Sequence, residues 1–141
     1  MHEVKQKTIL LVEDDATLAL AGRRILEGQG YRVIAAQDSK AALEEIVDNL
    51  DIDLVLMDLD LGPEMGGAEA ARQILKLREL PVVFHSSHTE PEIVARTEAI
   101  TSYGYVVKNT GSALLLAGVR NALEQILSSA EKEAVAAVDP S

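Results

Sequence analysis

Four apolar runs of this 141-residue sequence end in side chains that are able to do chemistry. In chain order these side chains are Asp14 with Asp15, Asp58, Ser86 and Lys108. Carboxylate oxygens without His or Cys select a hard cation, and a partial set of them suits Mg²⁺. A carboxylate can also be the nucleophile of phosphoryl transfer, where a metal ion, a lysine and a hydroxyl stabilise the phosphoryl oxygens. The residue types therefore indicate phosphoryl chemistry at a magnesium site.

Each of these residues also has an ordinary structural explanation. An Asp such as Asp58 can start a turn, a Ser can cap one, and a Lys at a strand end usually reaches water. One of Asp14 and Asp15 is expected to cap the helix that follows, which leaves the other acids unexplained. The functional hypothesis gains its weight from the order of the residues on successive strand ends.

The elements that position these residues alternate between strand and helix. Strands are predicted over Thr8–Val12, Tyr31–Ala35, Leu54–Met57, Pro81–Ser86 and Gly104–Val107. Helices are predicted from Ala16 to about Glu27, Ser39 to about Asn49, Ala68 to Arg78, a capping box at Thr89-Glu90-Pro91-Glu92 to about Ile100, and Ser112 to about Ala130. The helical periodicity turns Leu18, Val47, Leu50 and Leu77 towards the core.

Five strands alternating with five helices predict an α/β protein with a parallel sheet, right-handed crossovers and helices on both faces. With the strand order 2-1-3-4-5, the first, third, fourth and fifth strands lie side by side. Their carboxyl ends then share one rim, where ligands of open α/β sheets bind. The fold prediction therefore brings all the candidate residues together.

Composition limits the remaining possibilities. A net charge of -10 and 3% aromatic residues argue against a nucleic-acid surface. There is no cysteine, and no apolar run is long enough for a signal peptide or a membrane span. We expect a cytoplasmic protein that does not bind membranes, with an N-terminal arm at 1–7, one domain at 8–130, and a tail or the start of a connector at 131–141.

Four motifs together form a family pattern. They are Leu11-Val12-Glu13-Asp14-Asp15, Asp58 after Leu54-Val55-Leu56-Met57, Pro81-Val82-Val83-Phe84-His85-Ser86-Ser87-His88, and Gly104-Tyr105-Val106-Val107-Lys108. In these motifs the sequence resembles the CheY-like receiver domain of bacterial two-component response regulators, which implies a flavodoxin-like (βα)5 three-layer sandwich. The resemblance implies that Asp14 and Asp15 are the acidic pair that binds Mg²⁺, with help from Asp58 and the backbone carbonyl of Asp60.

The same resemblance assigns the remaining roles. Asp58 becomes the phosphoacceptor, Lys108 the invariant lysine, and Ser86 and Tyr105 the switch residues. Asp60 and His88, each two positions past a key residue, are expected to tune the lifetime of the phosphoryl group.

Three departures from the family pattern are visible. The segment Leu61–Gly67 looks one residue longer and richer in glycine than the usual loop after the acceptor. Asn109 follows Lys108 where a cis proline is usual, and a cis bond to a non-proline residue costs about 2.5–4 kcal/mol. Ser86 stands where threonine is commoner.

The resemblance makes the domain a signalling module rather than an enzyme, with a histidine kinase or a histidine phosphotransfer domain as its partner. The alternatives are a haloacid-dehalogenase-like phosphohydrolase that uses Asp58-Leu59-Asp60, and a docking module that needs no phosphorylation. The chain also resembles N-terminal receivers that precede PAS and histidine-kinase modules in hybrid sensor kinases. A homodimer through the fourth helix, fifth strand and fifth helix is a further expectation.

Overall fold

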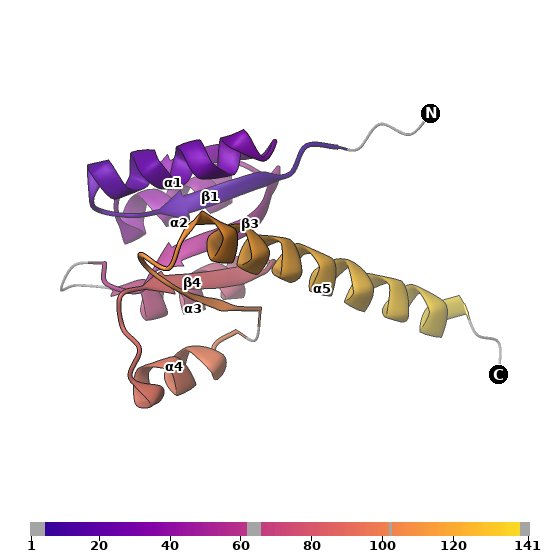
Figure 1. Ribbon diagram of the computed structural model, residues 1–141. Coiled ribbons are helices and arrows are strands. Elements are labelled where there is room, and N and C mark those ends of the chain that lie inside the picture. The colour runs from indigo at the N-terminus through magenta and orange to yellow at the C-terminus, as the bar shows by residue number, and fades with distance from the viewer. Residues whose placement is uncertain (1–4, 62–65, 102, 139–141) are drawn as a thin grey trace.

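The computed structural model describes the backbone of residues 5–61, 66–101 and 103–138, and side chains up to residue 126. Five strands form one sheet in the order β2-β1-β3-β4-β5, and every neighbouring pair is parallel (Figure 1). The predicted strand order is therefore confirmed. The strands are β1 Thr8–Val12, β2 Arg32–Ala36, β3 Ile52–Asp58, β4 Val82–Ser86 and β5 Tyr105–Val107.

Five helices follow the strands and cover both faces of the sheet. Helices α1 and α5 pack on one face, where Leu26, Leu115 and Val119 join a buried apolar cluster. Helices α2 and α3 pack on the other face through residues such as Ile46 and Ile74. The helices are α1 Ala16–Gly28, α2 Ser39–Asp48, α3 Gly66–Leu77, α4 Pro91–Glu98 and α5 Ser112–Val138. This is the three-layer α/β sandwich expected from the sequence.

Two aspartates cap helices, and one of them is Asp15, a cap candidate predicted from the sequence. Asp15 accepts hydrogen bonds from the backbone N–H groups of Thr17 and Leu18 at the start of α1. Asp38 accepts one from Ala41 at the start of α2. The capping box expected before α4 is wrong, because the cap residue is Glu90 and it makes no side-chain capping bond. The Glu90 carboxylate instead contacts the ring of His88.

Four apolar residues predicted to face the core, Leu18, Val47, Leu50 and Leu77, are exposed. Val47 is 62% exposed, Leu50 78% and Leu77 54%. On α2 the inward stripe consists of Ala42 and Ile46, so Val47 lies about 100° around the helix from the buried face. The other two lie at or beyond a helix end, since α3 ends at Leu77 and α2 ends at Asp48. The fourth, Leu18 of α1, is 42% exposed.

Helix α5 extends further than predicted. It continues past Ala130 to Val138, and Figure 1 shows it projecting beyond the sheet. Its distal part is rich in Ala and Glu, which have high helix propensity without any tertiary contact. Within the described residues, none of the helices combines the length and apolar character that crossing a bilayer would require.

Candidate functional site

The carboxyl ends of four strands meet at one rim of the sheet. Asp58 is the last residue of β3 and pairs with His85 of β4, while Ser86 ends β4 and pairs with Val107 of β5. Lys108 directly follows β5, and its backbone N–H donates to the carbonyl of Ser86 at 2.8 Å. The parallel register therefore brings the predicted acceptor, hydroxyl and lysine to adjacent positions.

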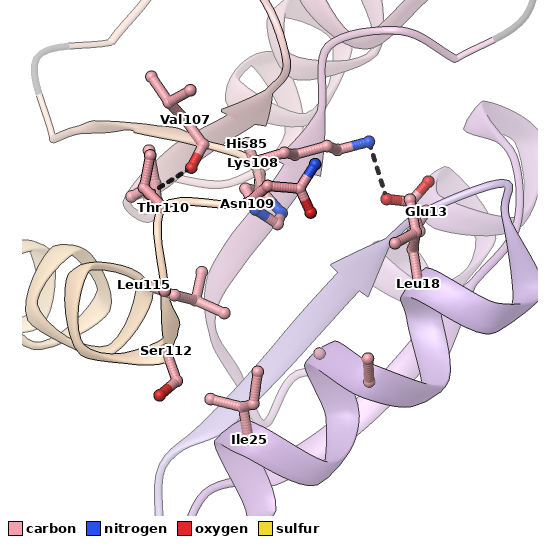
Figure 2. Close-up of a pocket in the computed structure, with 14 residues that line it drawn as sticks. Glu13, Leu18, Ile25, His85, Val107, Lys108, Asn109, Thr110, Ser112 and Leu115 are labelled. Carbon is pink, nitrogen blue, oxygen red and sulfur yellow. Dashed lines mark hydrogen bonds and ion pairs between the residues drawn. The ribbon is translucent and has the colours of Figure 1, made fainter.

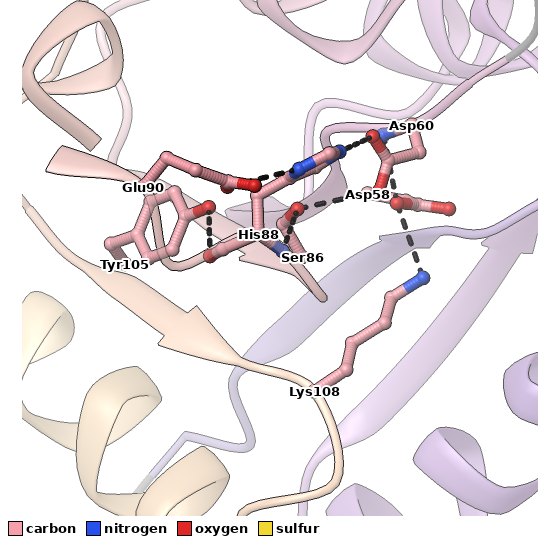
Figure 3. Close-up of polar contacts among 7 residues, drawn as sticks. All are labelled: Asp58, Asp60, Ser86, His88, Glu90, Tyr105 and Lys108. Atoms are coloured by element: carbon pink, nitrogen blue, oxygen red, sulfur yellow. Dashed lines mark hydrogen bonds and ion pairs between the residues drawn. The ribbon is translucent and has the colours of Figure 1, made fainter. Parts of the chain in front are cut away.

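An acidic group and one lysine form the inner part of the rim. Carboxylate oxygens of Glu13, Asp14 and Asp58 lie within 4.8 Å of one another. The Nζ atom of Lys108 lies 2.9 Å from Oε1 of Glu13 and 3.2 Å from Oδ1 of Asp58 (Figures 2 and 3). Glu13 and Asp58 are buried, whereas Asp14 is exposed to solvent. Such a set of oxygen ligands is compatible with a divalent cation.

Burial and charge shift the titration of this group. Removal from water, followed by the neighbouring Asp58, raises the pKa of Glu13 to about 7. Burial alone would lower the pKa of Lys108, but its contacts with Glu13 and Asp58 outweigh burial and raise it. The Lys108 ammonium group is therefore charged beside two buried carboxyl groups. The raised pKa of Glu13 means that this site favours a proton, or another positive charge, at the Glu13 carboxylate.

The acidic group differs in one member from the pair expected from the sequence. Asp15 uses Oδ1 to cap α1, and the third carboxylate beside Asp14 and Asp58 is that of Glu13. Sequence reasoning did not include Glu13 in the acidic group, although it directly follows β1 in a run of three acids. The signal was available, because a residue needed as a helix cap has one carboxylate oxygen already committed.

The outer part of the rim is a chain of polar contacts around His88. The Ser86 hydroxyl donates to Oδ2 of Asp60 at 3.3 Å and accepts from the backbone N–H of His88 at 3.1 Å (Figure 3). The His88 ring lies 2.9 Å from Oδ1 of Asp60 and 3.2 Å from Oε2 of Glu90. Its backbone carbonyl accepts the Tyr105 hydroxyl at 2.8 Å. These contacts connect four predicted site residues: Asp60, Ser86, His88 and Tyr105.

The outer chain is more exposed than the inner group. The side chains of Asp60 and His88 are 41% and 37% exposed. The carboxylate of Asp60, followed by a hydrogen bond to Glu90, raises the pKa of His88. Only the backbone of Asp60 reaches the acceptor, through an N–H that donates to Oδ1 of Asp58 at 2.9 Å.

Helix α3 begins directly against the acceptor strand. A Cβ atom on Gly67 would lie 2.1 Å from the backbone oxygen of Asp58, a distance that no side chain can adopt. The N–H of Gly67 donates to the carbonyl of Leu59 at 3.1 Å. Glycine at this position therefore fixes the turn after Asp58. The expectation of a longer loop concerns Gly62–Met65, which lie outside the described residues.

The link after Lys108 is trans, since the described residues contain no cis peptide bond. Asn109 adopts φ 64°, a left-handed conformation that Asn tolerates better than most residues. The hydroxyl of Thr110 donates to the carbonyl of Val107 at 2.6 Å and closes the turn into α5. The missing proline is thus replaced by a left-handed turn rather than by a cis bond.

A cavity of about 240 Å³ lies between α1 and the segment that joins β5 to α5 (Figure 2). Leu18, Ile25 and Leu115 form its apolar wall, and Lys108 lies at its edge. His85 also lines it, and burial lowers the pKa of His85 to about 4. The imidazole is therefore neutral at physiological pH and behaves as part of the packed wall.

A family model described as the response regulator receiver domain matches residues 9–120 of the chain. The match includes every residue of the rim described above, from Glu13 to Lys108.

Three known proteins illustrate the similarity. The N-terminal domain of a response regulator/sensory box/GGDEF three-domain protein from Carboxydothermus hydrogenoformans is 39% identical, with a TM-score of 0.81, over 88% of this chain and 99% of that one. The CAI-1 autoinducer sensor kinase/phosphatase CqsS of Vibrio cholerae is 30% identical over 79% of this chain and 16% of its own length. The transcriptional activator protein ExaE of Pseudomonas putida is 35% identical, over 82% and 54% respectively. The chain thus spans only part of these curated relatives.

Proposed function

Because the chain belongs to the response regulator receiver family, we propose that it accepts a phosphoryl group on Asp58 from a histidine kinase or a histidine phosphotransfer domain. The observation that supports this most is the position of Lys108, whose Nζ bridges the buried carboxylates of Asp58 and Glu13 at 3.2 and 2.9 Å. A buried carboxylate beside a fixed cation is oriented for attack, and the cation remains available for the charge that develops.

In the proposed step, a carboxylate oxygen of Asp58 forms a bond to phosphorus as the bond from phosphorus to the donor's leaving group breaks. The donor's imidazole leaves with the bonding electrons and takes a proton from solvent. Lys108 stabilises the phosphoryl oxygens. The N–H of Asp60 donates to Oδ1 of Asp58, the same oxygen that Lys108 contacts, so this oxygen is held in place. The domain itself is the substrate of this transfer, so it is a signalling protein rather than an enzyme with turnover.

The proposed cofactor is Mg²⁺, which when bound neutralises charge on the transferring phosphoryl group. Asp14, Asp58 and the backbone carbonyl of Asp60 are its proposed ligands, and Glu13 supplies a further negative charge within 4.8 Å. Asp15 is a weaker candidate than the sequence suggested, because its Oδ1 is already bonded to two backbone N–H groups of α1.

The proposed switch consists of Ser86 and Tyr105. In this structure the Ser86 hydroxyl donates to Asp60, so a phosphoryl oxygen on Asp58 would compete for that proton. Its reorientation would change the segment between β4 and α4, whose His88 carbonyl holds the Tyr105 hydroxyl. The surface of α4, β5 and α5 would then change its affinity for partners, a second copy of the chain being one of them.

Asp60 and His88 are proposed to tune the lifetime of the aspartyl phosphate. Both side chains are partly exposed beside the acceptor, where they can contact the attacking water. Exchange of both residues for Ala is expected to change the dephosphorylation rate more than a few-fold, with an unaltered fold measured by circular dichroism.

We further propose that the domain works at the N-terminal side of sensory or kinase modules in a longer protein. The extension of α5 to Val138 supports this, because it projects from the sheet as a connector would (Figure 1). Reading the source gene past the codon of Ser141 tests the proposal, and an open reading frame that continues into a sensory or kinase module is expected. A stop codon at that point would leave a stand-alone receiver.

Incubation with acetyl phosphate and Mg²⁺, followed by intact-protein mass spectrometry, tests phosphorylation. The parent is expected to gain one phosphoryl group and Asp58→Asn none. Asp51→Asn, an exposed aspartate just before the same strand, is the matched control and is expected to behave like the parent. A parent that gains no phosphoryl group under these conditions would favour a docking module instead.

A further inference from the structure

Lys108 lies in the turn between β5 and α5 rather than inside a strand. The preceding strand, β5, is the three residues Tyr105–Val107 at the edge of the sheet. The N–H of Lys108 donates to the carbonyl of Ser86 at 2.8 Å, and α5 begins at Ser112. A short edge strand holds the next residue less firmly than a central strand does. The turn therefore has to contribute to the position of the Lys108 ammonium group.

The far end of this turn is fixed by α5. Leu115 and Val119 of this helix are buried in the core beside β5. Gly118 allows the helix to approach the strand closely, because a Cβ atom at this position would lie 2.6 Å from Cγ2 of Val106. Since the helix packs so closely on β5, the chain has only residues 108–111 in which to reverse its direction.

Positive φ angles make such a tight turn possible. Asn109 has φ 64° and Gly111 has φ 101°, and among the described residues other than glycine Asn109 alone has a positive φ. The Thr110 hydroxyl donates to the carbonyl of Val107 at 2.6 Å and closes the turn around Lys108. Asn enters the left-handed region more readily than most residues, whereas β-branched residues are outliers there. The residue type at position 109 therefore decides how well the turn closes.

We propose that Asn109 is a positioning residue for phosphoryl transfer, whose left-handed backbone directs Lys108 to Asp58 and Glu13. The inference rests on the proposed function. The Lys108 side chain is 13% exposed, and its Nζ lies 3.2 Å from Oδ1 of Asp58 and 2.9 Å from Oε1 of Glu13. Figure 2 shows Lys108 reaching towards Glu13 from the turn that contains Asn109 and Thr110. Because the path of this side chain is confined, a change of the backbone at 109 displaces the ammonium group.

The test compares residues at position 109 that differ in their tolerance of a positive φ. Asn109→Gly removes the carboxamide and keeps the left-handed region open, whereas Asn109→Val disfavours that region strongly and Asn109→Ala less so. Asn121→Val makes the same chemical change at an exposed position of α5 and is the matched control. Intact mass over time measures the rate of phosphorylation by acetyl phosphate with Mg²⁺, and circular dichroism checks that each variant is folded.

Asn109→Val is expected to lower the rate roughly five-fold or more, since the left-handed region disfavours ordinary residues by at least this factor. Asn109→Gly and Asn121→Val are expected to keep the parent's rate within about two-fold. Asn109→Ala should lie between the two and provides a second test should Asn109→Val fold poorly. A rate for Asn109→Val equal to that of the parent overturns the inference. A rate for Asn109→Gly as low as that of Asn109→Val also overturns it, because the carboxamide rather than the backbone would then matter.

A double-mutant cycle with Lys108→Ala distinguishes positioning from general damage to the fold. If Asn109 acts through Lys108, exchange of Asn109 for Val has no further effect once the lysine side chain is absent. Over longer reaction times, we therefore expect less than about a two-fold difference between Lys108→Ala and the double variant. An equal loss of rate in both backgrounds would contradict the inference, because Asn109 would then act on something other than the lysine.

NMR of the lysine ammonium groups follows the same position without any phosphorylation. The Lys108 signal, identified by its absence from Lys108→Ala, is expected at one position in the parent and Asn109→Gly and at another in Asn109→Val. A signal that is unchanged in Asn109→Val overturns the inference, while the proposed function stands if Asp58 is still phosphorylated. If the parent gains no phosphoryl group but these signals behave as expected, the proposed function fails and the positioning of Lys108 by Asn109 stands.

Discussion

The two sides of Asp58 are built differently. On the inner side, buried Glu13 and a lysine at 2.9 and 3.2 Å from two carboxylates are fixed by strand ends. On the outer side, Asp60, His88 and Glu90 are partly exposed and belong to segments between elements. Buried charges in fixed positions can stabilise a transition state without reorganising, whereas exposed polar contacts contribute little free energy and are easily broken and re-formed with other partners. We infer that the inner side carries phosphoryl transfer and the outer side its readout.

The largest expected effect comes from removing the inner cation. Lys108→Ala should lower the rate of phosphorylation by acetyl phosphate about 10²- to 10³-fold, as loss of one preorganised charge typically does. The rate is measured by intact mass over time. Lys40→Ala, at an exposed lysine of α2, is the control and should leave the rate unchanged. A Lys108→Ala rate within two-fold of the parent would place the transfer chemistry elsewhere.

Substitution of the neighbouring residues Asp14 and Asp15 tests which of them binds Mg²⁺. Asp14→Asn should weaken Mg²⁺ binding about ten-fold or more, because a charged oxygen ligand is lost. Asp15→Asn should bind nearly as the parent does, because Asn caps helices as well as Asp. Isothermal titration of both variants measures the difference. Equal losses in the two variants would restore the pair Asp14 and Asp15 expected from the sequence.

The buried carboxyl group of the inner side makes stability depend on pH. Folding raises the pKa of Glu13 from 4.5 to about 7, so its contribution is fully present below pH 4.5 and is lost as the pH rises through 7. In chelator, Glu13→Gln should abolish a decline of about 1 to 3 kcal/mol in unfolding free energy across this window. Urea unfolding at several pH values measures the decline. Glu44→Gln, at an exposed position of α2, should retain the parent's slope.

The smallest effect on chemistry is expected on the outer side. Ser86→Ala should slow phosphorylation only a few-fold, but it should greatly reduce the chemical-shift response of α4 and β5 to beryllofluoride. Ser86→Thr keeps the hydroxyl and should retain the response. Amide spectra with and without beryllofluoride provide the measurement. A Ser86→Ala protein with the parent's full response would remove the hydroxyl from the switch.

The inner side also shows what sequence reasoning could recover. Asp58, Ser86 and Lys108 were predicted as neighbours because parallel strands bring their carboxyl ends to one rim, and the observed strand order confirms that placement. Among the three consecutive acids, the acidic cluster contains Glu13 and Asp14 rather than the expected Asp14 and Asp15. The sequence predicted a helix cap at Asp14 or Asp15 but left open which of them it is, and the burial of Glu13 depends on the turn after β1, which composition does not reveal.

The outer side was less predictable, and for a physical reason. The sequence around Glu90 has the form of a capping box, but its carboxylate contacts His88 instead of a backbone N–H. A local motif competes with long-range partners that only the fold supplies, such as Asp60, which lies 28 residues before His88. The same limit explains Val47, whose apolar character suggested a buried position that α2 does not provide.

The most direct test of the account is to locate the phosphoryl group. After reaction with acetyl phosphate and Mg²⁺, borohydride reduces an aspartyl phosphate to homoserine, and peptide mass spectrometry identifies the residue that changed. We expect homoserine at position 58 in the parent and at no position in Lys108→Ala within the same reaction time. Homoserine at another acid of the rim, such as Asp14 or Asp60, would contradict the account.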